Sequence, residues 1–106
     1  MSEFIQVTTT TGTRDVADRI AVELVDRRLA ACVQVSGPIQ STYRWQGKVE
    51  SNEEWLCTAK TSRAQLDGIR ELLKQLHPYE VPELIATPIV DGGEAYLKWL
   101  AEQLGR

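Results

Sequence analysis

Apolar residues in this sequence follow the period of a strand in some segments and the period of a helix in others. Residues 4–10 are rich in β-branched side chains and alternate in polarity, which predicts a strand. After residues 11–13, apolar residues recur every four positions at Val16, Ile20 and Leu24, which predicts an amphipathic helix. The order in which these two periods follow each other restricts the fold more than any other feature of the chain.

The same alternation continues to the end of the chain. Strand patterns cover residues 31–45, 49–60 and 83–90, and helix patterns begin at Ser62 and after Glu94. The first of these two helices opens with the Ser-x-x-Gln spacing of a capping box. The order β-α-β-β-α-β-α predicts a ferredoxin-like α+β sandwich, in which two right-handed crossovers build one antiparallel sheet with helices on one face.

The strand pattern of residues 31–45 is longer than one small domain can cover. It would extend over about 50 Å at ~3.3 Å per residue, whereas a domain of this size has a radius of gyration near ~13 Å. Gly37-Pro38 interrupts the pattern in the manner of a bulge, and Gln46-Gly47 predicts a tight turn into the following strand. We therefore expect a long hairpin that projects beyond its own core.

Three aromatic residues, Tyr43, Trp45 and Trp55, are expected on the outer arm of this hairpin. They could stack on a planar ligand, but aromatic residues on a projecting arm more often anchor a protein interface. Isolated two-stranded ribbons are only marginally stable in water, so the arm is expected to pack on a neighbouring subunit. This predicts a homo-oligomer.

The composition and net charge of the chain argue against some classes of binding partner. The 106 residues carry a net charge of -3 and no basic cluster, which argues against binding to nucleic acid or to an anionic membrane surface. No apolar run approaches the roughly 20 residues that span a bilayer, and the start of the chain does not resemble a targeting segment. We expect a single domain over residues 1–106, located in the cytoplasm, with Cys32 and Cys57 as free thiols in the core.

The segment from His77 to Glu83 contains the only histidine, two prolines, Tyr79, Glu80 and Glu83. A purely structural interpretation is available, since Pro78 stops a helix and a histidine suits the last helical turn. It does not account for the tyrosine and the two carboxylates, so the segment is also a candidate site. Imidazole and carboxylate groups bind zinc or copper, which makes His77 a candidate metal ligand, although one histidine cannot complete a strong site alone.

Two further residues are candidates for ligand binding. Lys60 ends a strand just before a helix, where a cation suits an anionic ligand, although a solvated strand end explains it equally well. Cys32 would act as a nucleophile only beside a base, and only His77 is available. Lys60, His77, Tyr79 and Glu80 together could line a cleft between subunits that binds a small polar or anionic molecule.

Several motifs in one order resemble the CutA family of divalent-cation tolerance proteins. They are Leu29-Ala30-Ala31-Cys32-Val33, Tyr43-Arg44-Trp45-Gln46-Gly47-Lys48-Val49-Glu50, Lys60-Thr61, His77-Pro78-Tyr79-Glu80-Val81-Pro82-Glu83 and Tyr96-Leu97 with Trp99. The resemblance implies a ferredoxin-like subunit, a PII-like homotrimer, and a role in tolerance to copper and other divalent cations. Copper-binding members can carry a second histidine and a cysteine where this chain has Leu76 and Thr9.

The predicted function is therefore a trimeric binding protein linked to divalent-cation tolerance. A copper or zinc ion, or a small ligand, would bind in clefts between subunits around His77. Two alternatives remain open from the sequence. One is an enzyme that uses His77 as a general base with Glu80 or Glu83 beside it. The other is a purely structural trimeric scaffold.

Overall fold

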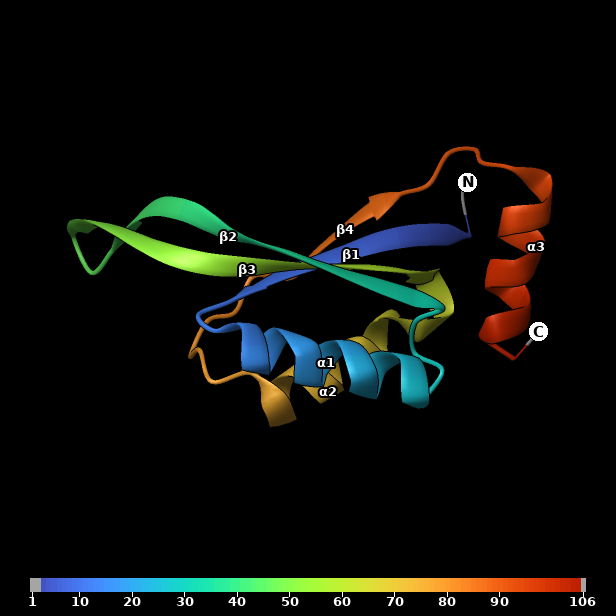
Figure 1. Ribbon diagram of the computed structural model, residues 1–106, viewed down its shortest axis with the longest axis horizontal. Coiled ribbons are helices and arrows are strands. Elements are labelled where there is room, and N and C mark those ends of the chain that lie inside the picture. Colours follow the sequence, from blue (N-terminus) through green and yellow to red (C-terminus); the bar gives the residue numbers. More distant parts are fainter. Residues whose placement is uncertain (1–2, 106) are drawn as a thin grey trace.

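The computed structural model describes residues 3–105, and its elements follow the predicted order. The elements are β1 (Phe4–Thr11), α1 (Arg14–Asp26), β2 (Cys32–Trp45), β3 (Lys48–Ser62), a 3-10 turn (Arg63–Gln65), α2 (Leu66–Leu76), β4 (Ile85–Pro88) and α3 (Glu94–Gln103). The strands form one antiparallel sheet in the order β2-β3-β1-β4. This confirms the predicted ferredoxin-like α+β fold (Figure 1).

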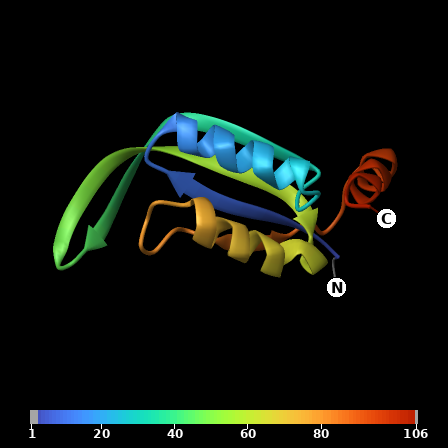
Figure 2. The same cartoon turned by 90° about the horizontal axis from the view of Figure 1, so that it is seen from below.

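Helices α1 and α2 lie side by side on one face of the sheet, as Figures 1 and 2 show. The main core forms where Ile5 and Val7 of β1 meet the buried face of α1 and α2, including Ile20 and Ile69. Each of these side chains is almost completely buried, and full burial of such a side chain stabilises the fold by about 1.5–3 kcal/mol. Alternate residues of β1, such as Gln6, point to the opposite face.

Helix α3 lies at one end of the sheet, away from the other two helices (Figure 1). Its buried residues Leu100 and Leu104 pack with Ala31 and Phe4 in a second, smaller cluster. No helix within residues 3–105 is both long enough and apolar enough to cross a bilayer.

The β2–β3 hairpin projects from the sheet, as expected (Figure 1). Strand β3 pairs with β1 only from Trp55 onwards, so residues 48–54 pair with β2 alone. The molecule is correspondingly elongated, with dimensions of 45 × 25 × 22 Å. The hairpin turn consists of Gln46 and Gly47, both with positive φ (50° and 79°), a conformation whose twist matches that of the flanking strands.

The predicted bulge at Gly37-Pro38 is confirmed by a shift in the β2–β3 register between Ser36 and Ile39. Gly37 has a φ of 151°, and a Cβ atom there would lie 2.8 Å from Cε3 of Trp55. Trp55 therefore packs within its own chain, where the guanidinium of Arg14 also lies 5.6 Å from its ring. The expectation that Trp55 belongs to the projecting arm is wrong, because β3 is still paired with β1 at this residue.

Two local predictions are also wrong. The fourth strand is limited to Ile85–Pro88 rather than residues 83–90, because only residues 5–8 of β1 pair with it. The expected capping box does not form: Ser62 is still part of β3, opposite Phe4, and its side chain does not cap the turn that follows. A 3-10 turn intervenes, and α2 begins only at Leu66.

Candidate functional site

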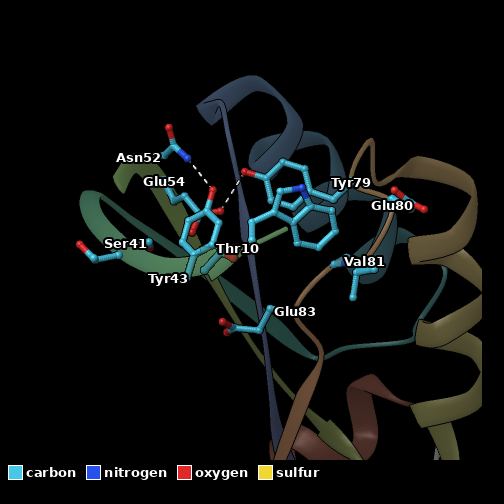
Figure 3. A pocket seen from close by; sticks show the side chains of 12 residues that line it. Thr10, Ser41, Tyr43, Asn52, Glu54, Tyr79, Glu80, Val81 and Glu83 are labelled. Atoms are coloured by element: carbon cyan, nitrogen blue, oxygen red, sulfur yellow. Dashed lines mark hydrogen bonds between the residues drawn. The ribbon is translucent and has the colours of Figure 1, made fainter. Parts of the chain in front are cut away.

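An open groove of about 740 Å³ lies between the projecting hairpin and the segment 79–83. We call it the hairpin groove. Aromatic and acidic side chains dominate its lining, which includes Tyr43, Trp45, Tyr79, Glu54, Glu80 and Glu83. Three separate parts of the chain contribute: the hairpin, the loop after α2, and Thr10 at the end of β1 (Figure 3).

The alternation of the hairpin strands places most of its groove residues on one face. Ser41 and Tyr43 of β2 lie in phase, and Ser41 is paired with Asn52 of β3. The side-chain amide of Asn52 donates a hydrogen bond to the hydroxyl of Tyr43, which holds the phenol ring over the hairpin (Figure 3). The strands of the hairpin therefore determine the position of this wall of the groove.

Tyr79 forms the opposite wall and reaches across to the hairpin. Its hydroxyl donates to Oε2 of Glu54 at 2.8 Å (Figure 3). It also lies over Gly12, where a Cβ atom would be only 3.2 Å from the tyrosine oxygen. Burial, together with the hydrogen bond to Glu54, raises the pKa of Tyr79 to about 12. The phenol is therefore a hydrogen-bond donor throughout the physiological pH range.

The three carboxylates of the groove differ in their surroundings. Glu54 is only 7% exposed, and the hydroxyl of Tyr79 is its hydrogen-bond partner. Within residues 3–105 it forms no ion pair, although a carboxylate buried to this extent is ordinarily paired with a cation. In Figure 3, Glu83 is directed toward the hairpin side of the groove and Glu80 is directed away from it.

His77 does not line the groove. The residue is 8% exposed. Its Nε2 is 2.7 Å from the carbonyl oxygen of Thr10, and its Nδ1 accepts the backbone N–H of Tyr79 at 3.2 Å. These partners are those of a neutral imidazole that carries its proton on Nε2. No ring nitrogen is left for a metal ion or a substrate proton, so the structure does not support His77 as a metal ligand or general base.

The structure separates Lys60 and Cys32 from the groove. They lie opposite each other on β3 and β2, on the sheet face away from α1 and α2. The ammonium group of Lys60 donates to Gln34 at 2.6 Å. Thr10, which contacts His77, pairs with Leu56, four residues and about 13 Å along β3 from Lys60.

Within a single chain, Tyr79, Glu80 and Glu83 line the hairpin groove, whereas Lys60, Cys32 and His77 do not. A cleft between subunits that contains Lys60, His77, Tyr79 and Glu80 stays a prediction. No group of three or more His, Cys, Asp or Glu side chains suited to hold a metal ion occurs in the described part of the chain.

No motif in the sequence singles out Glu54 and Asn52, although both line the groove. A usable signal was present, since the tight turn at Gln46-Gly47 fixes the register of the hairpin. Counting outward from that turn pairs Ser41 with Asn52 and places Glu54 on the same face as Tyr43. The contact between Glu54 and Tyr79 has no such local signal.

Comparisons with known proteins, by sequence and by structure, all find the same family. The family described as CutA1 divalent ion tolerance protein matches residues 5–103. The divalent-cation tolerance protein CutA of Thermus thermophilus is 44% identical over 105 residues, covering 99% of this chain and 100% of that protein. The chloroplastic protein CutA of Arabidopsis thaliana is 41% identical over 96 residues, covering 91% of this chain. This chain spans about half of that relative, 53% of its length.

Among solved structures, the periplasmic divalent cation tolerance protein CutA of Archaeoglobus fulgidus matches with a TM-score of 0.92. The two chains share 33% sequence identity, and the match covers 95% of this chain and 98% of the other. The similarity thus extends over the sheet, the helices and the long hairpin.

Proposed function

This chain belongs to the CutA1 divalent ion tolerance protein family, and from that premise we propose that it is a homotrimeric binding protein whose hairpin groove takes a divalent cation. The observation that carries the proposal is the arrangement of Glu54 and Glu83, whose carboxylates come from distant parts of the chain to line one groove. Carboxylate oxygens are ligands for divalent metal ions, including zinc and copper.

The proposed binding is weak in a single subunit. A firm site for zinc or copper usually needs three or four protein ligands, with nitrogen or sulfur donors prominent. The hairpin groove offers oxygen donors, and His77 is engaged within the chain. Further ligands would come from a neighbouring subunit, which makes the cleft between subunits the site of this weak binding.

The unsupported part of the hairpin favours assembly as a trimer with a PII-like arrangement. Within residues 3–105, residues 48–54 pair with no strand other than β2, and Tyr43 and Trp45 are 42% and 41% exposed on the same ribbon. A ribbon of this kind is marginal unless another surface covers it. A cytoplasmic location is proposed as well, because Cys32 and Cys57 are free thiols, as a reducing compartment favours.

Titration calorimetry with Cu²⁺ and Zn²⁺ tests the metal proposal. Glu83→Gln keeps the size of the side chain and removes its charge, so we expect affinity to fall about 10-fold, as loss of one charge-assisted contact predicts. Glu53→Gln is the matched control, because Glu53 is exposed and adjacent to Glu54 on the opposite face of β3. Equal affinity in the two variants would refute the site, and absence of binding by the wild type would favour a structural scaffold.

A further inference from the structure

We infer that Lys60 of the partner subunit supplies the counter-charge of Glu54, so that a second copy of this chain completes the hairpin groove. The inference rests on the homotrimer proposed above and names a pair of residues that joins its subunits. It follows from the face of the sheet on which the two charged side chains lie, and from what each of them lacks within its own chain.

Glu54 and Lys60 lie on the same face of the sheet. Helices α1 and α2 cover one face, and α3 lies at the end of the sheet (Figure 1). Glu54 and Lys60 are six residues apart on β3 and both point to the other face, which we call the open sheet face. Tyr43 and Trp45 lie on this face too, because Ile39 pairs with Glu54 and the alternation continues from there to the hairpin turn. The aromatic face of the hairpin therefore continues into the open sheet face.

The carboxylate of Glu54 needs a cation that its own chain does not supply. Glu54 is only 7% exposed in the single chain, and assembly can only bury it further. Its Oε2 accepts the neutral hydroxyl of Tyr79 at 2.8 Å, and it forms no ion pair within residues 3–105. A carboxylate buried to this extent is costly without a cation, so a subunit that brings an ammonium group to Glu54 gains affinity from the contact.

The ammonium group of Lys60 has the complementary need. The side chain is half-buried, and its Nζ donates at 2.6 Å to the neutral amide oxygen of Gln34. Among the described residues it has no carboxylate partner. The other lysine of β3, Lys48, is exposed beside the hairpin turn and can stay hydrated. A subunit that covers the open sheet face would remove Lys60 from water, which is favourable only if an anion meets it.

The two residues cannot satisfy each other within one chain. Six residues of an extended strand place their backbones about 20 Å apart. In a closed ring, each subunit can give its Lys60 to one neighbour and receive the Lys60 of the other, so that one repeated contact pairs every charge. Glu54 also belongs to the proposed metal site, so this ammonium group would compete with a divalent cation, in keeping with the weak metal binding proposed above.

The test is a double-mutant cycle in the full chain, with the dissociation constant of the trimer measured by sedimentation velocity over a dilution series. Lys60→Met keeps an unbranched side chain and removes the charge. We expect it to raise the dissociation constant about 30-fold, because Glu54 is left buried without a cation. In the Glu54→Gln background the same substitution should change it less than about 3-fold, since the charge pair is already absent. Lys74→Met, on the exposed side of α2, is the matched control and should sediment like the wild type.

Cross-linking of the wild type gives an independent readout that holds even if Glu54→Gln does not fold. A carbodiimide joins a lysine amine to a carboxylate in direct contact through an amide bond. We expect mass spectrometry to find Lys60 joined to Glu54 in the covalently linked dimer and trimer. Because the two residues are too far apart within one chain, this link would join two subunits.

Two results would overturn the inference. One is an equal effect of Lys60→Met in the wild-type and Glu54→Gln backgrounds, and the other is a Lys60 that is cross-linked only to other carboxylates or to none. Either result with a trimeric wild type refutes this pair alone and leaves the proposed trimer intact. A wild type that sediments as a monomer would refute the proposed trimer and the pair with it.

Discussion

The hydroxyl of Thr9 is buried without a hydrogen-bond partner within residues 3–105. Thr9 pairs with Cys57 across β1 and β3, and both side chains are almost completely buried. The thiol of Cys57 donates to the carbonyl of Ala17, and burial raises its pKa to about 11, so it stays protonated at neutral pH. An unsatisfied hydroxyl in such surroundings costs about 1–3 kcal/mol.

Replacing this hydroxyl by a methyl group should therefore stabilise the protein. We expect Thr9→Val to raise the free energy of unfolding by about 1 kcal/mol, measured by urea denaturation. The matched control is Thr11→Val on the same strand, because the Thr11 hydroxyl donates to the carbonyl of Thr13 at 2.7 Å. That variant should lose about 1 kcal/mol. A loss of stability in Thr9→Val would show that its hydroxyl has a partner after all.

At the scale of elements, the loop between α2 and β4 has no regular structure and is positioned by side-chain bonds. The ring of His77 ties it to the end of β1 through Thr10. The hydroxyl of Tyr79 ties it to β3 through Glu54. Pro78 adds a rigid backbone between these two anchors. The only histidine of the chain therefore has a structural role: its hydrogen bonds fix the position of the loop that forms one wall of the hairpin groove.

Tyr79→Phe should remove one of these anchors and change the pH dependence of stability. We expect a loss of about 1 kcal/mol at pH 8, where the hydroxyl of Tyr79 donates to Glu54. The folded-state pKa of Tyr79, about 12, lies above its ordinary value near 10.0. Its contribution is therefore complete below pH ~10 and is lost as the pH rises through ~12.

The measurement is urea denaturation of the wild type and Tyr79→Phe at pH 8 and pH 11. The stability difference between the two proteins should shrink at the higher pH. Comparing them cancels the contributions of other tyrosines, including Tyr96, whose pKa is also raised, mainly by burial. An unchanged difference between pH 8 and pH 11 would show that the bond between Tyr79 and Glu54 does not govern this titration.

At the scale of the whole molecule, the chain is 45 Å long because a two-stranded ribbon extends from a small sheet. The ribbon has two unlike faces. Gln40 and Thr42 form hydrogen bonds with Ser51 on its polar face, whereas Tyr43 and Trp45 lie on the other. An elongated ribbon with one aromatic face is suited to pack against another subunit.

Trp45→Ala should weaken the proposed trimer. Buried tryptophan anchors commonly contribute 2 kcal/mol or more to an interface, so we expect the dissociation constant to rise by about 30-fold. Sedimentation velocity over a dilution series measures this change. Val49→Ala is the matched control, since Val49 is 65% exposed and lies on the polar face of the ribbon. Equal sedimentation of both variants and the wild type would argue against Trp45 as an anchor.

Several features could be predicted from the sequence because they depend on residues close together in the chain. The period of the apolar residues determined the order of strands and helices and hence the antiparallel sheet. The glycine at position 47 and the excess length of β2 determined the tight turn and the projecting hairpin. The exact ends of β4 and the start of α2 were not predictable, because both depend on pairing with β1. Strand β4 extends only as far as β1 pairs with it, and α2 starts late because Ser62 still pairs with Phe4.

The role of His77 and the partners of Glu54 were decided by the tertiary structure alone. Thr10 and His77 are 67 positions apart, and Glu54 and Tyr79 are 25 apart, so no local pattern joins them. Their contacts depend on how β1 and β3 pair and on where the loop after α2 packs against them. The sequence by itself determined which elements form and how the hairpin turns. Only packing between distant segments decided that both ring nitrogens of His77 are hydrogen-bonded within the chain and that the buried carboxylate of Glu54 lines the groove.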